Sequence, residues 1–172
     1  MTVPLAVDWN AVSAVAAAGV LAWAVWEHGQ AARQRRNRDL ALLRALIVVT
    51  RGAEKILRRR RAEATEQGLP AAKVAQALLF TRGLEISMRA LEGVSLLDLP
   101  TANAVDALLA ARAGVENALA AAELIAAEQA PIEALDAGIA ALFKAAEKFD
   151  SERTKLRPLI DKLRRKPVES IA

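Results

Sequence analysis

The side chains that most often carry catalysis or hold metals are scarce in this chain of 172 residues. It has no cysteine and one histidine, His28. Disulfides, thiolate metal sites, cysteine nucleophiles and metal sites built on several histidines are therefore excluded. A serine–histidine–aspartate triad would have to use His28, which lies beside an uncharged N-terminal segment. The eight glycines are scattered singly, so the sequence also lacks a glycine-rich phosphate loop.

Two pairs of carboxylates have helical spacing, Glu85 with Glu92 and Glu116 with Glu123, each seven residues apart. Acid–base catalysis needs such groups to converge in a dry pocket. The same spacing is typical of a solvated helix face, and we adopt this simpler interpretation. We therefore expect a protein without enzymatic activity, metal or cofactor.

Charge is distributed unevenly along the chain. The net charge is +8 from Glu27 to Arg61, −7 from Asp98 to Glu152, and +5 from Arg153 to Ala172. A basic helix packed beside acidic helices explains this pattern, and we favour that explanation over a surface for the phosphates of lipid or nucleic acid. The densest basic run, Arg58–Arg61, has no interleaved aromatic residues for base stacking. We do not expect nucleic acid as a partner.

The N-terminal segment from Trp9 to Trp26 contains eighteen residues without a charge. As a helix it would be roughly 27 Å long, close to the thickness of a bilayer core. Trp9 lies at one end and Trp23 and Trp26 at the other, as expected of interfacial anchors. The basic residues that follow are Arg33, Arg35, Arg36 and Arg38.

These features predict a single transmembrane helix in the plasma (inner) membrane. The positive-inside rule places the N-terminus outside and the C-terminal domain in the cytoplasm. Two alternatives are a buried helix of a soluble protein, because the segment is rich in alanine, and a cleaved signal peptide. The signal peptide is disfavoured because no basic residue precedes the segment and Asp8 occupies the place of one.

Beyond the anchor, apolar residues at spacings of three and four predict helices over 31–66, 70–93 and 100–128 and from residue 131 onward. Gly68 and Pro70 separate the first two, and Asp98 or Thr101 is the expected N-cap of the third. The last helix has the most regular stripe, which resembles a coiled-coil heptad. Its members are Ile132, Leu135, Ile139, Leu142, Ala146, Phe149, Arg153, Leu156, Ile160 and Leu163. In the third helix, Leu108, Leu109 and Val115 are expected to face the core. Gly52, Gly83, Gly114 and Gly138 fall inside helices and indicate close helix crossings.

The predicted fold is all-α: an N-terminal anchor (1–30), an up-down bundle of about four helices (31–166) and a C-terminal tail (167–172). In such a bundle the last helix returns toward the membrane. This would bring Lys162, Arg164, Arg165 and Lys166 near Arg33, Arg35, Arg36 and Arg38, and both clusters are candidate contacts for anionic lipid. The leucine-rich loop 94–99 would face the same side, packed on the bundle or inserted into the interface.

The leading functional hypothesis is a non-enzymatic, single-pass membrane protein whose cytosolic bundle contacts a protein partner or anionic lipid. The expected partners are membrane lipid and either another protein or a second copy of the chain. One alternative is a membrane-active protein of the phage-lysis or toxin kind. Another is a soluble helical adaptor or nucleic-acid-binding module.

Overall fold

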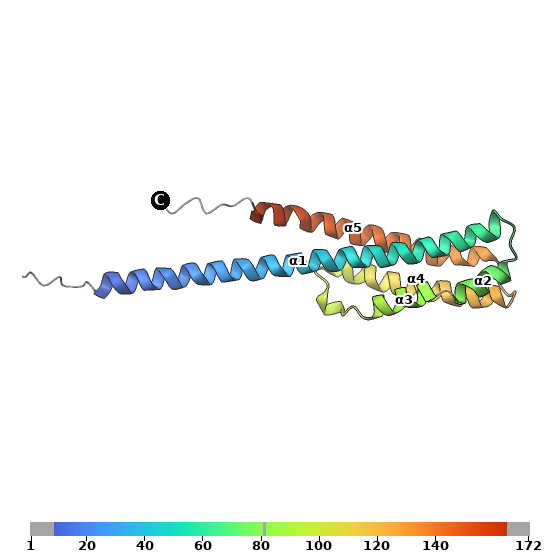
Figure 1. The fold of residues 1–172 in the computed structure, drawn as a ribbon, viewed down its shortest axis with the longest axis horizontal. Coiled ribbons are helices and arrows are strands. Elements are labelled where there is room, and N and C mark those ends of the chain that lie inside the picture. Colours follow the sequence, from blue (N-terminus) through green and yellow to red (C-terminus); the bar gives the residue numbers. More distant parts are fainter. Residues whose placement is uncertain (1–8, 81, 165–172) are drawn as a thin grey trace, which may run out of the picture. The chain divides into compact units, whose positions relative to one another are not determined.

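The protein, described by a computed structural model, is helical throughout the part that the structure describes (Figure 1). That part comprises the backbone of residues 9–80 and 82–164 and the side chains of residues 27, 30–80 and 82–158. The elements are α1 (Trp9–Thr65), α2 (Ala71–Leu79), α3 (Arg82–Glu92), η1 (Leu96–Asp98), α4 (Ala102–Ala126), η2 (Ile132–Leu135) and α5 (Asp136–Arg164). No strand occurs among these residues. The predicted all-α class and helical bundle are confirmed.

The chain divides into two compact units, Met1–Arg38 and Asp39–Ala172. The second unit contains the hydrophobic core, which draws residues from all five α-helices. Helix α1 contributes Leu43, Leu46, Ile47, Ala53 and Leu57, each at most 7% exposed. Together with the buried Thr50, they repeat at the three- and four-residue spacings that predicted this helix.

Helix α1 is one continuous helix, although the sequence predicted an anchor and then a separate helix from residue 31. Gly29 is the one helix-breaking residue at that junction, and a single interior glycine costs only about 1 kcal/mol. The helix ends at Thr65, and Gly68 follows with a φ of 66°. This left-handed conformation suits glycine and confirms the predicted helix end.

No helix among the residues with described side chains is long and apolar enough to cross a membrane. The predicted anchor, Trp9–Trp26, lies in the part of α1 whose side chains fall outside that description.

The helix predicted over 70–93 is two helices, α2 and α3, so this prediction is wrong. Leu78 of α2 and Leu84 of α3 are both fully buried. Six residues of continuous helix rotate a side chain by about 600°, which is about 120° away from the starting face. Ile47 and Ala53 of α1 are also six residues apart and are both buried in one continuous helix, so the burial of the two leucines does not by itself require the break.

Helices α4 and α5 run antiparallel and cross closely. A Cβ added to Gly138 of α5 would lie 2.8 Å from the Cβ of Ala118 and from the carbonyl oxygen of Gly114, both in α4. The predicted role of Gly114 and Gly138 in a helix crossing is confirmed. The same prediction is wrong for Gly52 of α1, because a Cβ added there would have nothing within 4 Å.

The heptad-like stripe begins in η2, continues into α5 and is buried through Phe149. Ile132, Leu135, Ile139, Leu142, Ala146 and Phe149 are each at most 7% exposed. One turn further, Glu152 is buried at 4% exposure, and the predicted member of the stripe, Arg153, is half-buried. In α4, Leu108 and Val115 are buried as predicted, but Leu109 is 47% exposed.

Candidate functional site

The basic residues that follow the uncharged run lie on α1. Arg33, Arg35 and Arg38 are exposed and Arg36 is half-buried. The side chains of Trp9, Trp23 and Trp26 lie outside the described residues. No carboxylate occurs between residues 33 and 38, so this turn and a half of helix presents four positive charges.

The second predicted basic cluster is at the end of α5. Lys162 and Arg164 belong to this helix, but their side chains lie outside the description. Arg165 and Lys166 lie outside the described residues altogether. The predicted proximity of this cluster to Arg33–Arg38 therefore stays a prediction.

The arginine run of α1 is engaged in ion pairs. Arg58 Nε lies 2.6 Å from Glu54, and the guanidinium of Arg58 lies 5.8 Å from the ring centre of Phe143 in α5. Arg59 and Arg60 both pair with Glu63, at 3.2 and 2.7 Å. Arg61 Nε lies 2.6 Å from Asp136, at the start of α5. Arg58 and Arg61 thus connect α1 to α5, whereas Arg59 and Arg60 pair with a carboxylate of α1 itself.

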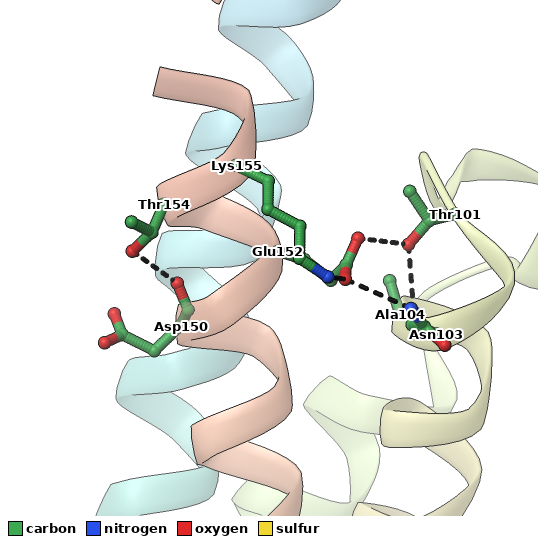
Figure 2. A network of polar contacts seen from close by, with 7 residues as sticks. All are labelled: Thr101, Asn103, Ala104, Asp150, Glu152, Thr154 and Lys155. Carbon is green, nitrogen blue, oxygen red and sulfur yellow. Dashed lines mark hydrogen bonds and ion pairs between the residues drawn. The ribbon is translucent and has the colours of Figure 1, made fainter. Parts of the chain in front are cut away.

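A second polar cluster joins α5 to the start of α4 (Figure 2). The buried carboxylate of Glu152 accepts hydrogen bonds from Thr101 Oγ1 at 2.9 Å, Asn103 Nδ2 at 3.2 Å and Lys155 Nζ at 2.7 Å. Thr101 Oγ1 also accepts from the backbone N–H of Ala104 at 3.1 Å, which confirms Thr101 as the N-cap of α4. The cluster therefore ties the beginning of one helix to the body of another.

Hydrogen bonds lower the pKa of two buried carboxylates, those of Glu152 and Glu63. The hydrogen bond from Lys155 lowers the pKa of Glu152 from its usual value, and those from Thr101 and Asn103 add to this, against the opposing effect of burial. The pKa of Glu63 is lowered chiefly by its hydrogen bond from Arg60. Both groups are thus ionised at neutral pH and act as acceptors in the bundle.

Arg112 is a charged residue that interrupts the apolar stripe of α4. It donates to the carbonyl oxygens of Leu91 at 2.8 Å, Glu92 at 3.2 Å and Val94 at 2.9 Å. The last carbonyls of a helix have no partner within it. Arg112 therefore caps the end of α3 from the neighbouring helix, a role that only the tertiary structure reveals.

The carboxylates considered for acid–base catalysis, Glu85, Glu92, Glu116 and Glu123, are all exposed. Glu85 forms a surface ion pair with Arg89, and the solvated interpretation of these residues is confirmed. Among the residues that the structure describes, no group of three or more histidine, aspartate or glutamate side chains is placed to hold a metal ion.

The leucines of the loop 94–99 differ in how far they are exposed. Leu99 packs against the core, whereas Leu97 is 96% exposed. Phe80, at the break between α2 and α3, is 87% exposed. Leu99 thus packs on the bundle, which was one of the two alternatives, and insertion of the loop into the membrane interface stays a prediction.

Comparison with protein-family models, curated proteins and solved structures finds no match to this chain.

Proposed function

We propose that the protein is a non-enzymatic, membrane-anchored helical bundle that acts by contact with anionic lipid and with a protein partner. The observation that carries this proposal is the uncharged run of residues 9–26, with tryptophan at both ends and four arginines directly after it. Tryptophan favours the membrane–water interface, and basic residues favour its cytoplasmic side. The anchor would hold the bundle at the inner face of the plasma membrane.

The exposure of Arg33, Arg35 and Arg38 supports the lipid contact. A basic residue near an anionic membrane surface contributes about 1 kcal/mol, and salt screens this attraction. Arg58–Arg61 lie about thirty residues beyond the uncharged run, roughly 45 Å along a helix, which is several times the Debye length of about 8 Å. The lipid contact is therefore assigned to Arg33, Arg35, Arg36 and Arg38, together with Lys162, Arg164, Arg165 and Lys166.

Membrane extraction tests the anchor. The full chain should stay in membranes washed with alkaline carbonate. The double variant Ala17→Asp, Val20→Asp should be released, because each carboxylate at the centre of a span costs about 2.5–3.5 kcal/mol. The matched control, Ala113→Asp with Ala120→Asp, changes two exposed positions of α4 and should be retained. Release of the unaltered chain would refute the anchor.

Vesicle binding tests the lipid contact separately. A chain that begins at Ala31 retains every core residue, all of which lie at or beyond Leu43. It should bind vesicles that contain phosphatidylserine more tightly than neutral vesicles. Reversing the four arginines at 33–38 to glutamate should weaken this binding by about 4 kcal/mol or more, roughly a thousandfold at low salt, because each arginine contributes about 1 kcal/mol. Reversal of the exposed Lys73, Lys144 and Lys148 is the control, and an equal loss there would contradict the assignment.

A further inference from the structure

One face of α1 is exposed and basic although it belongs to a helix of the core. The basic face consists of Arg44, Val48, Arg51, Gly52 and Lys55, all exposed. Ala41 and Ala45 extend it at the same spacing of three and four residues. Val48 is 71% exposed, and Arg44, Arg51 and Lys55 form no ion pair within the part of the chain that the structure describes.

Gly52 gives this face a further property. A glycine inside a helix destabilises it by about 0.5–1 kcal/mol relative to alanine. Within the described residues, a Cβ added at residue 52 would have nothing within 4 Å. The chain's own packing therefore does not require glycine at this position. A second helix that approaches the backbone closely would require it, as Gly114 and Gly138 show where α4 and α5 cross.

Helix α4 presents the opposite charge on an exposed face of similar length. The acidic face consists of Asp106, Leu109, Ala113, Glu116, Ala120 and Glu123, which alternate spacings of three and four. Leu109 and the adjoining Leu124 are each 47% exposed. Within the described residues, the carboxylates of Asp106, Glu116 and Glu123 form no ion pair.

We propose that the basic face of α1 binds the acidic face of α4 in a second copy of this chain. Three cations would meet three anions, and Leu109 and Leu124 would pack beside Ala45, Val48 and Gly52. Alternation of three and four residues is the spacing at which two helices pack side by side. Because both faces are exposed in one molecule, the contact must form between molecules.

An anionic membrane fits these observations less well. Helices that lie in a membrane interface carry large apolar residues such as tryptophan, phenylalanine or leucine on the buried face. The basic face of α1 has Val48 among alanines and a glycine. A membrane would also leave the acidic face of α4 without a role. Charge complementarity within one chain favours a second copy.

The contact joins two different surfaces, so it is heterologous. Such contacts generate rings when the rotation between copies closes, and open chains when it does not. The proposal does not rest on the membrane-anchored function, because neither face includes any residue between 9 and 38.

Charge exchange between the faces provides the test. The first variant carries Arg44→Glu, Arg51→Glu and Lys55→Glu, and the second carries Asp106→Lys, Glu116→Lys and Glu123→Lys. Sedimentation velocity of the full chain, in one non-ionic detergent throughout, measures association at low and high ionic strength. Association of the unaltered chain should weaken with salt, because exposed charges are screened. Each variant alone should associate at least about tenfold more weakly.

An equal mixture of the two variants should restore association, because each then offers a face complementary to the other's. The matched control changes the exposed Lys73, Lys144 and Lys148 to glutamate. It alters the net charge as much as the first variant does, and it should leave association intact. Circular dichroism should be unchanged in every variant, since all substituted side chains are exposed. Failure of the mixture to associate would overturn the proposal. The proposal would also be overturned if the first variant associated like the unaltered chain but no longer bound anionic vesicles. The basic face would then be assigned to lipid.

Discussion

Gly52 of α1 and Gly138 of α5 are predicted to respond in opposite ways to the same substitution. At Gly52 an added Cβ has nothing within 4 Å, so Gly52→Ala should stabilise the protein by roughly 0.5–1 kcal/mol through helix propensity alone. At Gly138 the Cβ would lie 2.8 Å from Ala118 and from the backbone of Gly114. Overpacking of this kind costs roughly 1–3 kcal/mol, which exceeds the gain in propensity.

Gly138→Ala should therefore lower the free energy of unfolding while Gly52→Ala raises it. The nearest atoms around Gly114 are at 3.1–3.3 Å, so Gly114→Ala should fall between the two. Urea denaturation of the full chain, followed by circular dichroism at high ionic strength, measures the order. High salt weakens the ion pairs of the proposed contact at Gly52, and a low protein concentration disfavours the association itself. If Gly138→Ala proves as stable as Gly52→Ala, the close crossing of α4 and α5 is wrong.

The polar clusters give two further predictions. Because the pKa of Glu152 is lowered in the folded protein, its contribution to stability is present above its unfolded pKa of about 4.3 and is lost as the pH falls through the folded value. Glu152→Gln should thus cost roughly 1–3 kcal/mol at pH 7, and a denaturation series should show this difference shrinking below about pH 4. Arg112→Met should cost roughly 1–3 kcal/mol and speed amide exchange at the end of α3. The exposed control Arg89→Met should change stability by less than about 0.5 kcal/mol, and equal effects of the two would refute the capping role of Arg112.

The parts of the fold that depend on periodicity could be predicted from the sequence. The stripe of α5 and the buried face of α1 repeat every three and four residues, and burial of one helix face imposes that period. Thr101 was predictable as a cap because its hydroxyl is the kind of group that accepts from the first free N–H groups of a helix. These signals are local, so they need no knowledge of the neighbouring helices.

Features that depend on the neighbouring helices could not be predicted in this way. The break between α2 and α3 falls within a run of apolar residues at ordinary helical spacing, and only the tertiary structure shows it. Glu152 and Arg153 are adjacent in sequence, and the burial of the glutamate depends on Thr101 and Asn103, about fifty residues away. Arg112 interrupts an apolar stripe, and its partners are backbone carbonyl oxygens. Such partners cannot be predicted from a pattern of side chains.

The distribution of charge separates the residues that hold the bundle from those available to a partner. We expected the basic helix to be neutralised by the acidic helices beside it. Arg61 does pair with Asp136 of α5, but Arg59 and Arg60 pair with Glu63 inside α1 itself. Arg44, Arg51 and Lys55 are exposed, as are the carboxylates of α4, and none of these groups forms an ion pair with another described residue. Surface charges without partners add little to stability. Their alignment on two faces with helical spacing is therefore better explained by binding than by folding, and the charge-exchange experiment distinguishes the two explanations.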